Sequence, residues 1–599
     1  MRNAGLAIPP AGPHKAVMRV ILDFPGGRQA FQAPRALIAA DRASEVPAAL
    51  AALSQALAAG RYVAGWLGYE LGYALEPRLE PLCPADGPLL RLGVFDAPAA
   101  EVPAPLGRAY AGPLHHDWDE AAYRTRFDAV KRMIAAGDIY QANLSYRARF
   151  AFAGDPLALY ERLRAAARAP WCGFIDDDER QILSLSPELF FELSAAGVIA
   201  ARPMKGTAPR HGDDRAEGAA LAASAKNRAE NLMIVDLIRN DLGRIAETGS
   251  VAVKALFAVE TYPTLHTMVS TVVARKRADA GPAELLRALF PCGSVTGAPK
   301  IRAMEILRAL EDTPRGAYCG AVGCFLPDGS ARFNVAIRTL TIAGRRGELG
   351  IGGGVVQDSE GAAEYAECRL KARFFETARP PLQLIETLRW HNGFVRLDSH
   401  LARMAASAET FGLAFDARKA HAALEGAVAL HAAPAPEGLA GEAAAAGPRA
   451  REGRKGGLRV RLTLDEAGRH DASAAPLEPN PPHWTYAIAP ARIVSTDLLQ
   501  RHKTNWRALY ERQGGLADEM LFRNERGELA EGARSTIFVE RGGVLLTPPL
   551  SAGALDGRLR AELLARDRAR EAVLTPADLD GAAVWLGNSL RGLIKAVPL

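Results

Sequence analysis

The chain has 599 residues, enough for several hydrophobic cores, about four at a typical domain length. Hydrophobic residues make up 49% and charged residues 24% of the sequence, which is ordinary for a globular protein. The 73 basic and 68 acidic residues give a net charge of +5 and are spread along the chain, so no basic arm indicates nucleic-acid binding. We therefore expect small anions or other proteins as partners.

Cysteine spacing and the N-terminal residues indicate a cellular compartment. The six cysteines include no CxxC pair, which argues against a disulfide scaffold or a structural zinc site and favours reduced thiols. Pro9, Pro10 and Pro13 interrupt the N-terminal residues before any apolar run reaches the length of a signal peptide or a membrane helix. We expect a cytoplasmic protein that does not enter a membrane.

Short strand-like runs alternate with helical periodicity before residue 376, which predicts a mixed α/β architecture in one large unit. The strand-like runs are "ILSLS", "LFFEL", "RFNVAIRTLTI" and "GELGIGGGVV", and the expected helices span 119–136, 217–241, 282–289, 299–311 and 360–376.

The stretch "RPMKGTAPR" at 202–210 places Lys205 between two prolines and directly before a glycine. Proline fixes φ and glycine opens the positive-φ region, so we expect a loop that holds Lys205 in one direction. A solvated turn is the alternative for a lysine considered alone.

The expected helix at 360–376 carries Glu360, Glu364, Glu367 and Lys371 on one face. A solvated charged face is one interpretation. However, the preceding strand ends in three glycines at 352–354, where a backbone can approach an anion closely. Glu230 lies in another helical stretch, and carboxylates from two helices would suit Mg²⁺.

A domain boundary is expected near "ETARPPLQ" at 376–383, because two prolines follow a helical pattern and precede the strand-like "LIETLRW". This predicts one domain at 1–378 and another at 379–599. The segment 433–457 is poor in large apolar residues, so we expect a flexible insertion in the second domain.

The second domain is expected to begin with a strand, a turn at Asn392-Gly393, a short strand and a helix. That helix places His400, Arg403 and Ser407 on one face. Lys503 precedes a later helical run, and residues 518–560 have a pattern of strand, turn, strand and helix.

Seven ordered motifs resemble the chorismate-utilising enzymes, and the match extends over most of residues 60–376. They are "GDIYQANLSYR", "SPELFFE", "RAENLMIVDLIRNDLGRI", "PCGSVTGAPKIRAMEIL", "RGAYCGAVGCF", "FNVAIRTL" and "GGGVVQDSEGAAEYAE". The resemblance implies a large α/β sandwich. Lysine before Gly-Thr is similar to the aminodeoxychorismate synthase component I branch, whereas related synthases usually carry alanine there.

This resemblance implies that Lys205 attacks C2 of chorismate and is displaced as ammonia adds at C4. A covalent adduct divides a difficult substitution into two steps. Glu188 would be the general acid at the C4 hydroxyl, and His266 would lie beside the ring, although a buried structural histidine is the alternative. Further implied residues are Glu230, Glu364 and Glu367 for Mg²⁺, and Ser294, Tyr318, Arg338, Gly352, Gly353 and Gly354 for substrate carboxylates.

Residues 383–599 resemble the fold-type IV pyridoxal phosphate enzymes, which implies two α/β subdomains and a possible homodimer. The family includes branched-chain and D-amino-acid aminotransferases and aminodeoxychorismate lyase. The resemblance implies that Lys503 forms a Schiff base with pyridoxal phosphate and that Glu531 pairs with the pyridine nitrogen, which makes the ring an electron sink. The phosphate would be held by Arg403, Ser589 and backbone amides at Ala554 and Leu555, before an expected helix.

Together the two resemblances imply amination of chorismate followed by elimination of pyruvate, which would yield 4-aminobenzoate for folate. No cysteine occupies a Gly-x-Cys-x-Gly turn, so we expect a separate glutamine amidotransferase subunit to supply ammonia. The alternatives are an anthranilate synthase-like first half, an aminotransferase second half, or a non-catalytic second module.

Overall fold

The computed structural model describes residues 17–210, 212–261, 265–432, 457–511 and 517–599. The proline-rich N-terminal residues, and all but residue 457 of the expected insertion, lie outside these ranges. The chain forms two compact units. Both contain helices and strands, which confirms the mixed α/β class. One contains Met1–Ala104, Leu114–Phe150 and Tyr160–Ala378, and the other contains Pro105–Pro113, Ala151–Leu159 and Arg379–Leu599.

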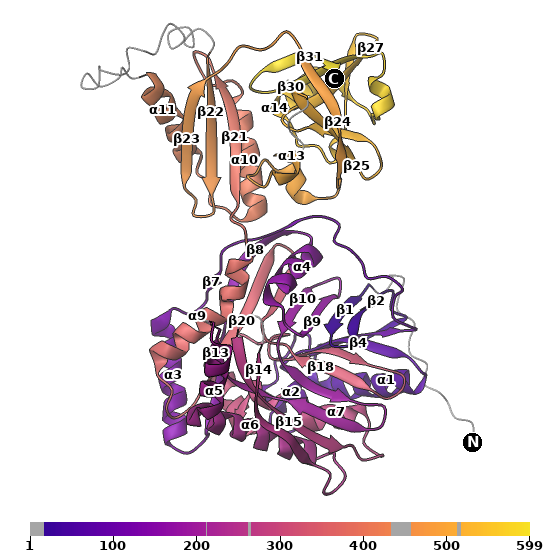
Figure 1. Cartoon of the computed structure of the whole chain (residues 1–599), viewed down its shortest axis with the longest axis vertical. Helices are drawn as coiled ribbons and strands as arrows, with labels where there is room; N and C mark the ends of the chain where they lie inside the picture. The colour runs from indigo at the N-terminus through magenta and orange to yellow at the C-terminus, as the bar shows by residue number, and fades with distance from the viewer. Residues whose placement is uncertain (1–16, 211, 262–264, 433–456, 512–516) are drawn as a thin grey trace, which may run out of the picture. The chain divides into compact units, whose positions relative to one another are not determined.

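The first unit contains two large sheets (Figure 1). In spatial order, the first sheet consists of β16 (Gly297–Ala298), β8 (Gln141–Gly154), β20 (Arg346–Val355), β19 (Thr339–Ala343), β10 (Gln181–Ser186), β9 (Trp171–Asp176), β1 (Arg19–Phe24) and β2 (Gly27–Phe31), with β7 (His115–His116) beside β8. The second consists of β13 (Met204–Pro209), β15 (Leu265–Arg275), β12 (Val198–Arg202), β11 (Leu189–Leu193), β18 (Ala331–Val335), β17 (Ala321–Phe325), β4 (Tyr62–Leu67), β5 (Leu90–Phe95) and β3 (Ala36–Ala40), with β14 (Ala252–Thr261) beside β15.

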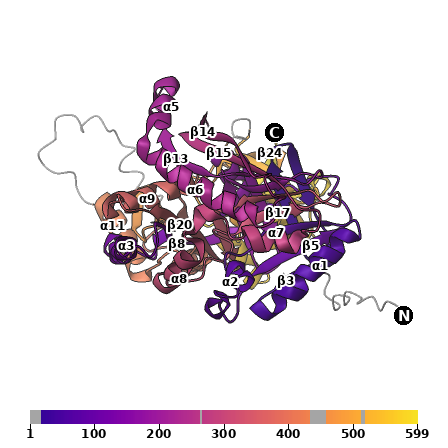
Figure 2. The same ribbon diagram turned by 90° about the horizontal axis from the view of Figure 1, so that it is seen from below.

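Helices cover these sheets and apolar side chains fill the layers. Val20, Trp66 and Ile182 belong to a core to which strands of both sheets contribute. A second core joins the second sheet, which contains β4 and β17, to α1 (Val46–Ala58), α6 (Ala225–Gly243) and α7 (Pro282–Leu289). Helix α1 packs beside α7 (Figure 2). The remaining helices are α2 (Leu71–Leu75), α3 (Glu120–Ala135), α4 (Pro156–Ala167), α5 (Asp214–Ala223), α8 (Lys300–Leu310) and α9 (Gly361–Thr377), of which α3 and α9 pack on β20.

Local structure differs from expectation at three places that shape the first unit. The expected loop at 202–210 is largely strand β13, whose register with β15 shifts between Met204 and Thr207. The expected helix at 217–241 is two helices, because Ser224 leaves the helical conformation and its hydroxyl accepts a hydrogen bond from the amide of Asn227. The run "RFNVAIRTLTI" forms β18 and β19 in different sheets, with Arg338 at φ 49° between them.

The second unit contains a small and a larger sheet. The small sheet comprises β21 (Gln383–Trp390), β22 (Leu458–Asp465) and β23 (His470–Pro476), which pack with α10 (Leu397–Phe411) and α11 (Ala417–Ala432). The larger sheet comprises β26 (Leu529–Gly532), β25 (Glu519–Asn524), β24 (Trp484–Ile493), β31 (Gly592–Pro598), β30 (Ala583–Asn588), β27 (Thr536–Arg541), β28 (Val544–Thr547) and β29 (Ala569–Glu571), with α13 (Ala508–Glu511) and α14 (Arg558–Ala565). The expected short strand after Asn392-Gly393 is only an isolated bridge between Trp390 and Phe394.

Two short segments from the first half of the sequence complete the core of the second unit. Strand β6 (Ala109–Ala111) pairs with Phe152–Gly154 at the end of β8. Tyr110 is fully buried, and its ring centroid lies 5.3 Å from that of Phe411 and 6.3 Å from that of Trp506. Within the described residues, no helix combines the length and apolar character needed to span a membrane.

Candidate functional site

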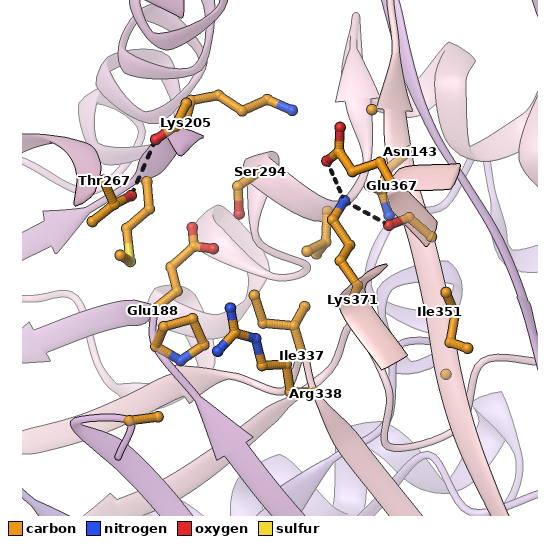
Figure 3. A pocket seen from close by; sticks show the side chains of 18 of the residues that line it. Asn143, Glu188, Lys205, Thr267, Ser294, Ile337, Arg338, Ile351, Glu367 and Lys371 are labelled. Atoms are coloured by element: carbon orange, nitrogen blue, oxygen red, sulfur yellow. Dashed lines mark hydrogen bonds and ion pairs between the residues drawn. The ribbon is translucent and has the colours of Figure 1, made fainter. Parts of the chain in front are cut away.

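A cavity of about 500 Å³ in the first unit contains most of the first group of expected site residues. The side chains of Lys205, Glu188 and Glu367 surround the same space (Figure 3). Its lining also includes Ser294, Tyr318, Arg338, Gly352, Gly354, Glu230 and Glu364.

Lys205 enters this cavity from the irregular part of β13. Gly206 has φ +89°, and its carbonyl accepts a hydrogen bond of 3.2 Å from the Thr267 hydroxyl, which fixes the backbone beside the lysine. The Lys205 Nζ lies 3.8 Å from the Glu230 carboxylate. A Cβ at Gly354 would lie 2.6 Å from this Nζ, so glycine is needed for the amine to occupy its position.

Glu188 has the electrostatic character of a general acid. Its side chain is almost fully buried, and Oε1 has no hydrogen-bond partner among the described residues. Burial raises the pKa of Glu188 to about 7, although Ser294 and Lys205 partly oppose the increase. A carboxyl group with such a pKa can hold a proton near neutral pH.

Two helices bring carboxylates to the cavity, Glu230 from α6 and Glu364 and Glu367 from α9. Burial raises the pKa of Glu364, whose carboxylate accepts a 2.7 Å hydrogen bond from Ser359. Burial would also raise the pKa of Glu367, but the nearby Lys371 ammonium, 2.9 Å away, lowers it overall.

This set of oxygen donors fits a hard cation. Mg²⁺ commonly uses one or two carboxylates and completes its coordination with waters and substrate oxygens. The carboxylates of Glu230, Glu364 and Glu367 do not form a compact trio; among the described residues, such a trio of ligand atoms within 4.8 Å occurs at Asp214, Glu217 and His266. A magnesium ion in the cavity would therefore depend partly on water and substrate.

The candidate carboxylate receptors occupy distinct positions in the lining. The Arg338 guanidinium has no hydrogen bond or ion pair with another described residue, and burial lowers its pKa. Tyr318 packs so closely on Gly350 that a Cβ there would lie 2.0 Å from the ring. Gly352 and Gly354 line the cavity, whereas Gly353 does not, although a Cβ there would lie 3.4 Å from Glu364 and 3.5 Å from Lys371.

His266 does not line this cavity. Because side chains alternate along β15, Thr267 reaches the cavity while His266 lies on the other side. Its Nε2 is 3.4 Å from Asp214 and 3.5 Å from Glu217 on α5, and its Nδ1 is 2.9 Å from the Thr261 hydroxyl. The structure thus places His266 against a helix and away from the ring position expected for it.

Sequence reasoning missed several lining residues. The Lys371 ammonium donates to the Gly352 carbonyl at 2.9 Å, and nearby Glu367 and Cys368 raise its pKa despite the opposing effect of burial. Its i, i+4 spacing from Glu367 was visible in the sequence, but that spacing is equally typical of a solvated helix face. The other missed polar residues are Asn143, Arg168, Lys226 and Thr267.

A second cavity, of about 440 Å³, lies in the second unit. Lys503 lines it, and its Nζ donates to the Thr387 hydroxyl at 3.1 Å. Burial lowers the pKa of Lys503 to about 8, and the nearby positive charges of Arg403 and Arg507 act in the same direction, while Glu386 opposes the decrease. A substantial fraction of this amine is therefore neutral near physiological pH.

Glu531 faces the same cavity from β26. Burial raises its pKa to about 7. Its carboxylate accepts hydrogen bonds from the Tyr510 hydroxyl, from Gln500 at 3.3 Å and from the Leu555 amide at 2.9 Å. The Leu555 amide is thus engaged with Glu531, and Ala554 does not line the cavity, so these amides are not arranged as the expected phosphate site.

Arg403 and Ser589 also line the cavity and belong to a connected network of hydrogen bonds. Arg403 donates two hydrogen bonds to Glu386, at 2.7 and 2.8 Å, and one to the Asp556 carbonyl. The His400 ring lies 2.6 Å from Glu386 and 2.7 Å from the Ser589 hydroxyl. Gly557, Arg558 and Leu559, at the N-terminal end of α14, also line the cavity and could present amides to an anion.

Sequence comparison identifies the two modules that contain these cavities. Residues 98–377 match the chorismate binding enzymes, and residues 383–597 match amino-transferase class IV. The chain therefore contains a domain that matches the chorismate binding enzymes, followed by a domain that matches the class IV amino-transferases.

Individual relatives of known designation match the first module. Aminodeoxychorismate synthase component 1 of Klebsiella aerogenes is 46% identical over 285 residues, which cover 47% of this chain and 62% of that protein. The chain thus spans less than two thirds of this relative. The first module shares its fold with a solved structure from Bacillus anthracis, a provisionally assigned 2,3-dihydroxybenzoate-specific isochorismate synthase. The two are 20% identical with a TM-score of 0.51, and the match covers 61% of this chain and 97% of that chain.

For the second module, a provisionally assigned amino-acid aminotransferase from Mesorhizobium loti is 40% identical. The match covers 36% of this chain and 100% of that chain, with a TM-score of 0.31.

Proposed function

We propose that the chain makes 4-aminobenzoate from chorismate in two reactions, amination at C4 and elimination of pyruvate. The observation that carries the proposal is Lys205 beside Glu230 in a cavity that also contains the high-pKa Glu188. The aminodeoxychorismate synthase relative supports amination at C4 for the first module.

In the first cavity, the Lys205 amine attacks C2 of chorismate, and the C4 hydroxyl leaves as water with the proton that Glu188 supplies. Ammonia then adds at C4 as the lysine leaves C2, which forms 4-amino-4-deoxychorismate. Arg338, Ser294 and Tyr318 would orient the carboxylates of the substrate. Glu230, Glu364 and Glu367 would hold a magnesium ion, whose positive charge would stabilise the ring carboxylate.

In the second cavity, the lowered pKa of Lys503 and the buried carboxylate of Glu531 fit a pyridoxal phosphate site. When bound, this cofactor supplies an electron sink at the substrate amine. Lys503 removes the proton from C4, and the bond between C3 and the enolpyruvyl oxygen breaks, so that the ring becomes aromatic. The released enolpyruvate takes up a proton at its methylene carbon and becomes pyruvate. Ser589, His400 and the first turn of α14 would orient the phosphate group.

The ammonia would come from glutamine hydrolysed by a separate amidotransferase subunit. This agrees with the designation of the relative as component 1. We expect the purified chain to use ammonium in place of glutamine. Turnover with glutamine as fast as with ammonium would contradict this assignment.

Two lysine variants test which of the two reactions takes place in each cavity. With chorismate, ammonium, magnesium and pyridoxal phosphate, Lys503→Ala should accumulate 4-amino-4-deoxychorismate, whereas Lys205→Ala should leave chorismate unchanged. Lys205→Ala should still convert added 4-amino-4-deoxychorismate to 4-aminobenzoate. Formation of 4-aminobenzoate by Lys503→Ala, or failure of wild type to convert the added intermediate, would overturn the second assignment.

A further inference from the structure

The second cavity contains more arginines than its internal contacts use. Most of them are engaged: Arg403 with Glu386, Arg507 with the Ala533 carbonyl, Arg534 with Glu519, Arg558 with Asp556, Arg591 with Asn480, and Arg108 with Asp497. Arg459 and Arg461 also line the cavity, but neither guanidinium has a hydrogen bond or an ion pair with another described residue; only their backbones are paired, with β21 and β23.

Strand geometry places these two guanidiniums on one face. Along β22, Leu458, Val460 and Leu462 are buried in the apolar core, while Arg459 and Arg461 alternate with them and are exposed. Residues two positions apart on a strand project from the same face, with Cα atoms roughly 7 Å apart. The pair can therefore contact two separated anionic groups on one ligand.

The neighbouring strand fixes their relation to the reactive amine. Arg461 is paired with Thr387 on β21, and Thr387 accepts the hydrogen bond from Lys503. Side chains of directly paired residues lie on the same face and about 5 Å apart at Cβ. An anionic group bound by Arg461 would thus lie on the side of the cavity from which Lys503 projects.

The same face carries additional uncompensated positive charge. Arg459 is paired with Arg389, whose Nε is buried without a hydrogen-bond partner. Like charges directly opposite each other destabilise a sheet, and a bound carboxylate would relieve that repulsion. Guanidinium groups also match carboxylates in shape and hydrogen-bonding geometry.

We propose that Arg459 and Arg461 form a carboxylate-binding subsite that selects amines carrying two carboxylates. This rests on the proposed function, in which the amine 4-amino-4-deoxychorismate carries one carboxylate on its ring and one on its enolpyruvyl group. An amino acid with a single carboxylate leaves one guanidinium without an anionic partner. The subsite therefore favours the dicarboxylate over ordinary aminotransferase substrates.

Kinetics of Arg459→Gln, Arg461→Gln and the double variant test this subsite in the full, cofactor-loaded chain. With 4-amino-4-deoxychorismate, each single change should raise KM about 10-fold or more, with little change in kcat, because charge-assisted hydrogen bonds to the substrate are lost. Lysine at either position should restore part of the affinity. Arg469→Gln is the matched control, because this exposed arginine pairs with Asp465 and does not line the cavity.

A measurement of ligand binding tests the subsite independently of the proposed reaction. Isophthalate, an aromatic dicarboxylate, should bind wild type more tightly than benzoate does in calorimetry, and the double variant should lose this difference. An unchanged KM, an equal effect of Arg469→Gln, or undiminished isophthalate preference in the double variant would overturn the subsite. If wild type does not convert 4-amino-4-deoxychorismate but the double variant loses the isophthalate preference, the proposed reaction fails and the subsite stands.

Discussion

At the scale of single residues, the two cavities differ in the surroundings of the lysine that each contains. Lys205 lies beside a carboxylate in a cavity rich in oxygen donors. Lys503 lies among guanidiniums in a cavity that also contains a buried glutamate. These surroundings agree with the substitution at carbon that we propose for the first cavity and with the proton transfer that we propose for the second.

Replacing Lys205 tests its role as a nucleophile. Lys205→Ala should lower the rate of amination about 1000-fold or more, since loss of a covalent nucleophile has effects of this order. Lys226→Ala is the matched control, because Lys226 lines the same cavity without a proposed covalent role, and its effect should be below about 10-fold. The measurement is the initial rate of chorismate consumption; equal rates for Lys205→Ala and wild type would exclude a nucleophilic Lys205.

The pKa of Glu188 predicts a pH dependence. A carboxyl with a pKa of about 7 is protonated below this pH and loses its proton as the pH rises. At constant free ammonia, amination should therefore decline above about pH 7. Glu188→Gln should lower the rate about 100-fold or more and remove this decline, and persistence of the same decline in the variant would assign it to another group.

At the scale of elements, Gly354 of strand β20 provides room for the Lys205 amine. Gly354→Ala would place a methyl group 2.6 Å from the Lys205 Nζ. The lysine can move, so we expect little change in stability but a decrease of about 100-fold in amination, because a displacement near 1 Å can have that effect. Gly243→Ala, on α6 with no atom within 4 Å of the added Cβ, is the control. Normal amination by Gly354→Ala would contradict the position assigned to the amine.

The positions of the site residues on their strands and helices show which parts of the site could be predicted from the sequence. The motifs around Glu188, Lys205 and Glu364 identified residues that the fold brings to one cavity, because each motif combines unusual residues in a fixed local order. The phase of β15 was harder to predict, since neighbouring His266 and Thr267 lie on opposite sides of the strand. Similarly, the Leu555 amide precedes a helix as expected, but the long-range partner Glu531, 24 positions away, engages it.

At the scale of the whole molecule, the second unit includes sequence from both halves of the chain. Tyr110 contributes to its core, and Arg108 bonds to Asp497, Gln500 and the Trp506 carbonyl within it. No sequence pattern near residues 105–113 indicated this contribution, because it depends on packing against residues nearly 400 positions away. A segment that contained only Arg379–Leu599 would therefore lack part of the second unit, namely Pro105–Pro113 and Ala151–Leu159.

Tyr110→Ala tests this dependence. Removing a fully buried aromatic ring should destabilise the second unit by about 3–5 kcal/mol. It should also lower the rate of the proposed elimination of pyruvate at elevated temperature, while the proposed amination is retained. Tyr140→Ala is the control, since the Tyr140 side chain is 67% exposed. Thermal unfolding followed by cofactor absorbance and by amination rate distinguishes the units. Selective loss of amination in Tyr110→Ala would contradict the assignment.

The most direct test of the account supplies the purified chain with chorismate, ¹⁵N-ammonium, magnesium and pyridoxal phosphate. The products should be 4-aminobenzoate that contains ¹⁵N and an equal amount of pyruvate, separated by chromatography and identified by mass spectrometry. Anthranilate as the labelled product would contradict the chemistry assigned to Lys205, and accumulation of labelled 4-amino-4-deoxychorismate would contradict the chemistry assigned to Lys503.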